Sequence, residues 1–324
     1  MPGFTTHYIM GMKVFNEMSP SYLKHIIAKY RWLYQLGLQG PDMFFYNLPI
    51  LRHRDYRNVG SYMHESHVND FFSCCLTHLS QISSKQQREQ GLSYLCGFIC
   101  HYIGDSVCHP FIYGRIHYTL EQPNNHCAGL HAALENELDA ILLQKYKRKK
   151  PSEFNQAATI CLNAQEIQFI SYFLCQCINE TYYPITEENS YQVTARMIHR
   201  SILALRFGCR TLSDPSGRKS SSIGFVETLI LKQPIASQKL VTDNIRNIKQ
   251  SLNSNHDAWI NPWDRSVSYA SFPDLFNRTL EQCLQIYSLI NRALATGTLF
   301  ENPDFQDILT ALGNKSYHSG LDVD

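Results

Sequence analysis

The feature that most constrains this chain of 324 residues is the spacing of its apolar side chains, which recur three and four residues apart over most of its length. That period is typical of amphipathic helices, whereas the two-residue alternation of a half-buried strand is rare here. The helical period runs through residues 7–18, 22–36, 66–82, 87–103, 126–146, 151–180, 191–212, 237–252 and 272–295. The sequence therefore predicts an all-α fold, a bundle of many helices.

Glycine and proline interrupt the helical pattern at a few places. Gly40-Pro41, residues 214–217 and Asn261-Pro262 are expected to form loops, because these residues seldom lie inside a helix. The stretch 212–222 is rich in Ser, Gly and Pro and is the expected flexible connection. Burial improves with chain length, so 324 residues can build an adequate core in one or two domains.

Charge is sparse and balanced in this sequence. Only 18% of the residues are charged and the formal net charge is +1, so no global field draws the protein to nucleic acid or to an anionic membrane. The basic run KYKRKK at residues 145–150 is a local exception. It fits a solvated helix end, where cations meet the negative end of the helix dipole. The alternative is transient contact with a membrane surface.

The cysteines and the N-terminal segment bear on the cellular compartment. The 11 cysteines lack the paired spacing of a zinc ribbon or a redox motif, so we expect reduced thiols. The first residues lack a basic segment followed by an apolar run, which argues against a secretory signal. No stretch reaches the roughly 18 apolar residues that span a bilayer, so no transmembrane segment is expected. These features predict a soluble, cytoplasmic protein.

Histidines, 14 in all, are concentrated together with acids in the first half of the chain. His101, Asp105 and His109 follow one another at four-residue intervals, and His131 and Glu135 repeat this spacing. Side chains four residues apart lie on one face of a helix, so each set can meet one cation. Zinc takes imidazole nitrogen and carboxylate oxygen as ligands, and rigid helices preorganise them. The spacing therefore predicts a metal site built on two helices.

The competing explanation is a buried cluster held together by hydrogen bonds alone. It would place three polar side chains on a helix among Phe98, Ile99, Ile103 and Val107, at a cost in desolvation. Metal ligation satisfies the same polar groups and accounts for their place on an apolar helix. A single histidine is usually a core or surface residue, whereas two such sets occurring together favour a metal site.

The run His101-Tyr-Ile-Gly-Asp105 resembles the HYxGD signature of the zinc-dependent phospholipases C of bacteria, whose superfamily includes single-strand zinc nucleases. In that family the signature's aspartate bridges two zinc ions and its histidine is a terminal ligand, roles that the resemblance gives to Asp105 and His101. The resemblance covers roughly residues 1–143. We expect one continuous helical domain in which residues 1–150 form the zinc-binding, catalytic half and residues 151–324 pack on it.

Taken residue by residue, the resemblance implies two or three zinc ions. The first would be held by Asp42, His64, His101 and Asp105, the second by His109, His131 and Glu135, and the third by His7 with Asp105. His53 and His67 compete with His64 for its role. His64 is preferred because it follows the segment Gly60-Ser-Tyr-Met63, which is similar to the family's approach to that ligand.

Three departures separate this sequence from the family. The family's third zinc ion is also bound by the amino group of an N-terminal tryptophan, whereas this chain begins Met1-Pro2. Removal of Met1 would leave the Pro2 amine five residues before His7, a spacing similar to that of the related nucleases, and intact mass tests this hypothesis. In addition, His109 follows Asp105 by four residues, where the secreted enzymes have a slightly longer gap. No lipid-binding β-sandwich follows the helical part.

The function that the resemblance implies is hydrolysis of a phosphodiester, with a phospholipid headgroup as the leading substrate. Clustered zinc ions lower the pKa of a water molecule toward ~7, which supplies hydroxide, and they neutralise the charge of the phosphate. Asp42 is the expected acceptor of the water's proton, and therefore the expected catalytic residue. The resemblance thus predicts a zinc-dependent, phospholipase C-like phosphodiesterase.

Two other functions fit the same residues. A zinc-dependent nuclease or nucleotidase would have a similar ligand order, but nucleic acid binding usually needs a basic groove with stacking aromatics, so balanced charge disfavours it. A non-catalytic helical scaffold would keep zinc only for stability. Removal of metal by a chelator separates the possibilities, because an enzyme loses turnover whereas a scaffold loses only melting temperature.

Overall fold

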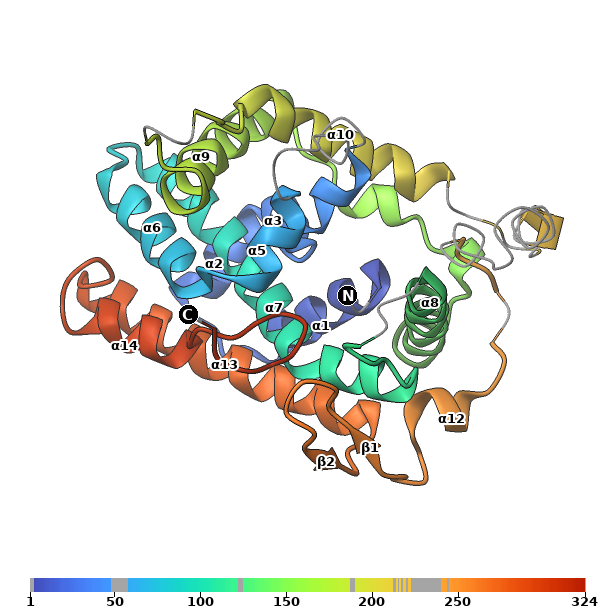
Figure 1. Ribbon diagram of the computed structural model, residues 1–324. Helices are drawn as coiled ribbons and strands as arrows, with labels where there is room; N and C mark the ends of the chain where they lie inside the picture. The colour runs from blue at the N-terminus through green and yellow to red at the C-terminus, as the bar shows by residue number, and fades with distance from the viewer. Residues whose placement is uncertain are drawn as a thin grey trace.

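The computed structural model describes residues 3–47, 58–121, 125–186, 190–211, 214, 216, 218–219, 221–222, 240–243 and 245–323. These residues are mostly helical, which confirms the predicted all-α class (Figure 1). The elements are α1 (Phe4–Glu17), α2 (Tyr22–Lys29), α3 (Arg31–Gly37), η1 (Gly40–Tyr46), α5 (Val59–Glu65), α6 (Val68–Gln81), α7 (Lys85–Arg115), α8 (Asn125–Lys147), η2 (Pro151–Glu153), η3 (Gln156–Thr159), α9 (Ala164–Tyr182), α10 (Ala195–Thr211), α12 (Ile248–Leu252), β1 (Trp259–Ile260), β2 (Val267–Ser268), α13 (Phe272–Thr296) and α14 (Asp304–Leu312).

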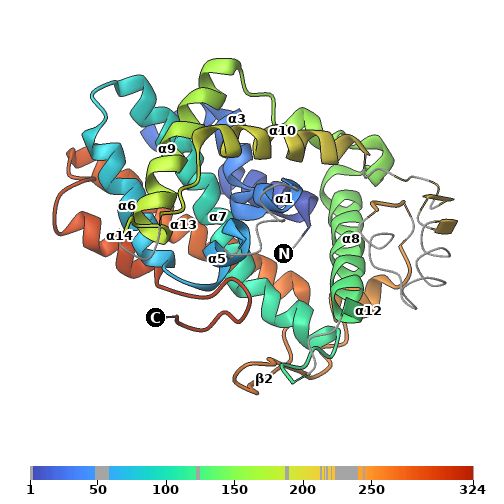
Figure 2. The same cartoon turned by 45° about the horizontal axis from the view of Figure 1, so that its top comes forward.

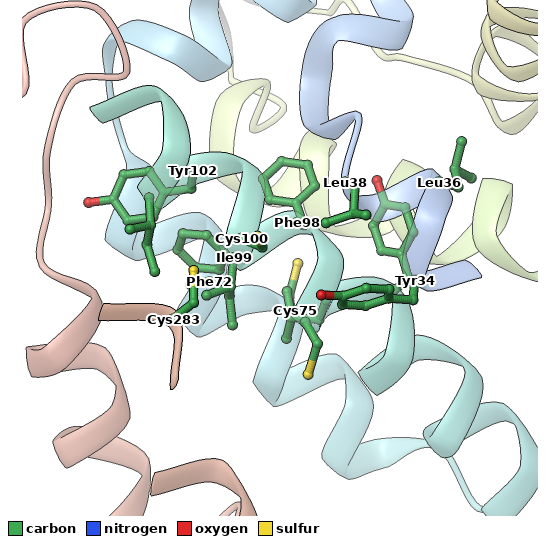
Figure 3. Close-up of a cluster of buried hydrophobic side chains, with 14 of the residues drawn as sticks. Tyr34, Leu36, Leu38, Phe72, Cys75, Phe98, Ile99, Cys100, Tyr102 and Cys283 are labelled. Carbon is green, nitrogen blue, oxygen red and sulfur yellow. The ribbon is translucent and has the colours of Figure 1, made fainter. Parts of the chain in front are cut away.

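Helix α7 is the centre of the bundle. Nearly every residue from Glu89 to Gly114 is buried, because α1, α2, α3, α6, α8, α9 and α13 all pack on this helix. A helix that is buried on all sides needs no polar face, and for this reason apolar side chains occur on every side of α7. Figure 3 shows Phe98 and Ile99 of α7 among Phe72 of α6 and Cys283 of α13. Any polar side chain on this helix is therefore shielded from water.

The other helices are arranged around α7 in a way that leaves α1 deep in the molecule. Figure 1 shows α9 and α10 on one side of α7, and α13 with α14 on the other. Figure 2 shows α8 beside α1, close to the N-terminus, and the two helices are in contact. As a result, α1, α7 and α8, which carry most of the predicted zinc ligands, are neighbours.

Helices α3 and α7 meet backbone to backbone. A Cβ on Gly37 would clash with the carbonyl oxygen of Tyr94, and one on Gly97 would clash with that of Tyr34. Only glycine allows such an approach, because it has no Cβ. The contact brings the carbonyl group of Leu38, which follows α3, against the middle of α7.

Several predicted helix boundaries differ from the structure. The segment 22–36 is broken at Tyr30, whose ψ of 41° ends α2 and precedes α3. The segment 87–103 is too short, because α7 continues to Arg115 and contains Pro110. Proline lacks an N–H group, so the carbonyl of Ser106, four residues earlier, has no partner within the helix.

The second half of the chain also departs from the predicted ranges. Within 151–180 only α9 is a regular α-helix, because Asn163 and Glu166 form a capping box that starts it. Of the segment 237–252, the structure describes a helix only in α12, and residues 240–243 are not helical. The predicted loop at Asn261-Pro262 is confirmed as the turn between β1 and β2.

The last described residues, 313–323, form a loop that crosses over α7 (Figure 1). Within this C-terminal loop the amide of Ser316 donates to the carbonyl of Leu321, 2.8 Å away. Gly320 has a φ of 67°, and a Cβ on it would clash with the carbonyl oxygen of Ser106. The loop thus lies against the carbonyl that Pro110 leaves without a helical partner, directly beside the predicted metal site.

The 11 cysteines are all free thiols. Among the described residues, no helix combines the length and the apolar character that crossing a bilayer requires. The basic run 145–150 begins in the last turn of α8 and continues into the coil that follows, and its residues are mostly exposed.

Candidate metal centre

Four of the predicted ligands meet in one buried cluster, which we call the first cluster: Asp42 of η1, His64 of α5, and His101 and Asp105 of α7. One ligand atom of each residue lies within 4.8 Å of those of the other three. Nε2 of His64 is 3.3 Å from Oδ1 of Asp42 and 3.5 Å from Oδ2 of Asp105. Nε2 of His101 is 3.6 Å and 3.2 Å from the same two oxygens. Two imidazoles and two carboxylates therefore surround a common point.

Three further predicted ligands form the second cluster: His109 of α7, and His131 and Glu135 of α8. Nε2 of His131 is 2.6 Å from Oε1 of Glu135, and Nε2 of His109 is 3.8 Å from the same oxygen. Nδ1 of His109 also lies 3.9 Å from Oδ2 of Asp105. Asp105 therefore lies between the remaining members of the first cluster and the second cluster.

His7, the eighth predicted ligand, reaches the same carboxylate from α1. Its Nε2 is 3.0 Å from Oδ1 of Asp105, the oxygen that does not face the first cluster's histidines. Its ring stacks on that of His101, with the centroids 4.1 Å apart. All eight predicted residues are thus brought together around Asp105, although they come from five elements.

Asp139, one turn beyond Glu135 on α8, has a different role. Its carboxylate oxygens accept hydrogen bonds from the amides of Thr5 and Thr6, at 2.9 and 2.7 Å. These amides lie in the first turn of α1, where helix N–H groups have no intrahelical partner. Asp139 therefore holds the start of the helix that carries His7.

Backbone carbonyl groups orient the first cluster's histidines. Nδ1 of His64 donates to the carbonyl of Gly60 at 2.6 Å, and Nδ1 of His101 donates to that of Leu38 at 3.1 Å. A hydrogen on Nδ1 leaves Nε2 with its lone pair directed into the cluster, which is how proteins fix metal-binding imidazoles. The contact between α3 and α7 thus contributes to the site, because it positions the carbonyl of Leu38 that orients His101.

The C-terminal loop contacts residues of both clusters through Tyr317. Its carbonyl accepts a hydrogen bond from Nδ1 of His109 at 2.6 Å, and its amide donates to the carbonyl of His64 at 3.0 Å. The next residue, His318, places its ring 5.4 Å from that of His64 and 5.6 Å from that of His109. His318 is partly exposed. It therefore lies at the edge of the site, between the clusters.

No sequence pattern predicted a role for Tyr317 or His318. His318 is a single histidine in a segment without helical period, and nothing in its neighbours predicts a contact with α5 and α7. Its Nδ1 lies 3.1 Å from the hydroxyl of Tyr113, which belongs to α7. Only the path of the chain after α14 brings these residues to the site.

The other candidate histidines lie elsewhere. His67 precedes α6, its side chain is 41% exposed, and its Nδ1 pairs with Asp70 at 3.1 Å. The structure thus places His64 in the first cluster and leaves His67 outside it. His53 lies outside the described residues.

The buried atoms of these clusters are poorly satisfied without a cation. Nε2 of His64, His101 and His109, Oδ1 of Asp42 and both oxygens of Asp105 are buried and have no hydrogen-bond partner among the described residues. Buried polar atoms without partners are costly, and they are rare in folded proteins. The same atoms converge on common points and are nitrogen and oxygen, the donors that zinc accepts. The residues present therefore fit zinc.

Charge favours the protonation states that zinc needs. Burial alone would raise the pKa of Asp105, but the charges of His101, His109 and His7 hold it well below its usual range. Burial lowers the pKa of His109 to about 4, so its ring is neutral at neutral pH. An ionised carboxylate beside neutral imidazoles is the state in which these groups bind metal.

His64 behaves differently when no cation is present. Burial alone would lower its pKa, but the carboxylates of Asp105 and Asp42, 3.5 and 3.3 Å from its Nε2, raise that pKa to about 9. A proton on His64 then partly balances the two carboxylates. A zinc ion would take the place of this proton, because both are attracted by the same charges.

Comparison with known families gives one match. The model of the family described as zinc-dependent phospholipase C matches residues 6–183. The match contains all eight predicted ligands and extends past residue 143, where the resemblance was expected to end, to include α9. Comparisons with curated proteins and with solved structures give no match. Since the family model covers more than half of the sequence and contains both clusters, the chain belongs to the zinc-dependent phospholipase C family.

Proposed function

We propose that this protein is a phospholipase C-like phosphodiesterase that hydrolyses the headgroup phosphodiester of a phospholipid. The observation that carries the proposal is the pair of neighbouring histidine–carboxylate clusters inside a helical bundle, with Asp105 of the first cluster 3.9 Å from His109 of the second. Membership of the family supports zinc as the metal and hydrolysis as the reaction. The sequence signature alone left the relation of the two clusters open.

We assign the zinc ligands as the two clusters group them. One ion would be held by Asp42, His64, His101 and Asp105, a second by His109, His131 and Glu135, and a third by His7 with Asp105. When bound, zinc supplies a Lewis acid that lowers the pKa of a water molecule and offsets the negative charge that develops on the phosphate.

The burial of the clusters suggests where substrate approaches. The side chains of His64, His101 and Asp105 are fully buried, whereas those of His131 and Glu135 are 15% and 13% exposed. Solvent therefore reaches the site from the side of the second cluster. The phosphate of a substrate would enter past the second cluster and would reach the surroundings of Asp105 last.

Asp42 is the residue that we propose to accept the proton of the attacking water. Its side chain is 7% exposed, whereas the other three members of the first cluster are fully buried. Phosphoryl transfer needs positioning and charge stabilisation more than covalent help, and no further nucleophile is required. Tyr113 and His318, at the edge of the site, are placed to hydrogen-bond a phosphate oxygen or the leaving group.

Transient contact with a lipid surface is part of the proposal. The β1–β2 hairpin exposes Ile260, Val267 and Tyr269, with exposed fractions of 45%, 56% and 62%. In the turn of this hairpin, the ring of Trp263 lies 5.0 Å from that of Tyr113, which borders the second cluster. Exposed apolar groups beside the open side of the site are suited to an interface with lipid.

The test combines metal analysis with substrate assays on the full chain. We expect two or three catalytic zinc ions per chain and release of a phosphorylated headgroup from phosphatidylcholine, both lost after treatment with a chelator and restored by zinc. A protein that cleaves single-stranded DNA but no lipid would be a nuclease instead. A protein that binds zinc and cleaves neither these substrates nor a chromogenic phosphodiester would be a scaffold, and the proposal would be wrong.

A further inference from the structure

A second kind of metal-binding group lies between α6 and α9. Cys74 and His78 are four residues apart on α6, and Cys177 faces them from α9. One ligand atom of each lies within 4.8 Å of the other two. We propose that these three residues bind a structural zinc ion through two thiolates and one imidazole, in a site separate from the histidine–carboxylate clusters.

The position of the three side chains on two packed helices supports this assignment. Residues four apart on a helix share a face, so Cys74 and His78 present their ligand atoms to the same point on α9. The thiol of Cys74 already points at Cys177, whose carbonyl oxygen is 3.8 Å from its sulfur. Cys177 is buried, while His78 is partly exposed. An ion could therefore enter from the side of His78, while Cys177 lies on the buried side of the group.

The third ligand is oriented in the manner of known zinc sites. Nε2 of His78 is 2.7 Å from Oε2 of Glu180, which lies three residues after Cys177 on α9. With Nε2–H donated to a carboxylate, Nδ1 is left to bind the ion, and such a carboxylate fixes the ring and raises its basicity. Two cysteines, one histidine and one water give the four-coordinate arrangement that zinc prefers.

The thiols have little chemistry of their own without an ion. The hydrogen bond to Cys177 and burial raise the pKa of Cys74, and burial raises the pKa of Cys177. Both thiols are therefore protonated at neutral pH and are weak nucleophiles. Zinc removes these protons on binding, so that two Zn–S bonds replace two S–H bonds and two protons pass to the solvent.

An ion here would fasten α9 to the helix that follows the first cluster's histidine. His64 lies in the last turn of α5, shortly before α6 begins. The carbonyl of His67 accepts a hydrogen bond from the hydroxyl of Tyr182 at the end of α9, 3.4 Å away. Helices held by a metal ion resist separation, because binding free energy adds to folding free energy. We therefore expect the site to act on stability and not on the chemistry of hydrolysis.

X-ray absorption at the zinc edge separates the two kinds of site, because all ligands assigned in the catalytic clusters are nitrogen or oxygen. The zinc-loaded full chain should show a sulfur shell at ~2.3 Å beside the nitrogen and oxygen shell near ~2.0–2.1 Å. Cys177→Ser and Cys74→Ser should each lose the sulfur shell and one zinc per chain, and should melt at a lower temperature. Cys161→Ser, which changes an exposed cysteine, is the control and should retain all three properties.

A variant of the catalytic cluster provides the complementary test. Asp105→Asn should lose catalytic zinc while keeping the sulfur shell, and the cobalt-loaded wild-type chain should show a thiolate-to-cobalt charge-transfer band in the near ultraviolet. These readouts hold even if a cysteine variant fails to fold. The inference is wrong if zinc in the wild-type chain has only nitrogen and oxygen neighbours, if Cys161→Ser abolishes the sulfur shell, or if Cys74 and Cys177 form a disulfide in the zinc-loaded protein.

Discussion

Asp105 is the residue on which the proposed metal centre depends most. One carboxylate oxygen faces His7, and the other faces His64 and His101 at 3.5 and 3.2 Å. Its side chain is fully buried, so its charge is tolerated only because cationic or metal-binding groups surround it. The HYxGD resemblance predicted this role from five residues. It could not predict His318, because a single histidine in an irregular segment carries no pattern.

Replacing Asp105 with asparagine keeps its size and removes its charge. We expect zinc affinity to fall by more than ~100-fold, since even partners beyond the ligands are worth ~10–100-fold in affinity. Phosphodiesterase activity should be lost with it. Asp70→Asn is the matched control. The side chain of Asp70 is 72% exposed, and it pairs with His67, which lies outside both clusters. Unchanged zinc content in Asp105→Asn would contradict the assignment.

His318 allows a separate prediction at the same scale. It touches the rings of His64 and His109 but belongs to neither cluster. His318→Ala should therefore retain zinc and lose activity by ~10²-fold or more, the contribution typical of a positioned acid or base. Elemental analysis and kcat on the same preparation measure both. Full activity, or loss of zinc, would refute the proposed place of His318 at the substrate.

Zinc affinity should depend on pH through His64. Burial would lower its pKa, but Asp105 and Asp42 raise it to about 9 in the metal-free protein. This proton stabilises the metal-free fold below the unfolded pKa near ~6.5, and the contribution is lost as the pH rises through 9. Zinc must displace the proton below pH 9, so affinity should rise roughly tenfold per pH unit from neutrality and then level. Competition with a chromophoric chelator measures this, and a flat profile would count against it.

At the scale of elements, period and capping account for most of what the sequence predicts. Helix α13 begins at a capping box of Ser271 and Asp274 and ends at Gly297, whose φ is 79°, close to the predicted limits. Periodicity fails where local geometry or tertiary packing decides. Tyr30 breaks a continuous apolar period, and Pro110 lies inside a helix because α7 is enclosed by its neighbours and by the C-terminal loop. Errors in the predicted helix boundaries do not affect the four-residue spacing of the predicted ligands, because that spacing requires only one turn of helix.

The contact between α3 and α7 should be sensitive to a single methyl group. Gly97→Ala would push α3 away, because its Cβ meets the backbone of Tyr34. We expect a loss of ~1–3 kcal/mol in the free energy of unfolding, as for other overpacked sites, together with weaker zinc binding through His101. Gly91→Ala is the control, since its Cβ would meet side-chain atoms of Leu79 and Phe169 and no backbone atom of another helix. Chemical denaturation of both variants tests the prediction, and equal stability would contradict it.

At the scale of the whole molecule, the site is assembled from distant parts of the chain. The ligands lie between His7 and Glu135, whereas Tyr317 and His318 come from beyond the family match. Sequence patterns report local spacing and order, so they indicated the candidate metal ligands but not the residues that cover them. The packing of α13 on α7 supports our proposal that residues 1–150 and 151–324 form one continuous domain.

The measurement that tests the central claim most directly is anomalous diffraction from crystals of the zinc-loaded protein, recorded on both sides of the zinc absorption edge. We expect separate peaks within the first and second clusters, with Asp105 between them. Strong anomalous peaks elsewhere, with His101, Asp105 and His109 contacting only protein atoms, would contradict it.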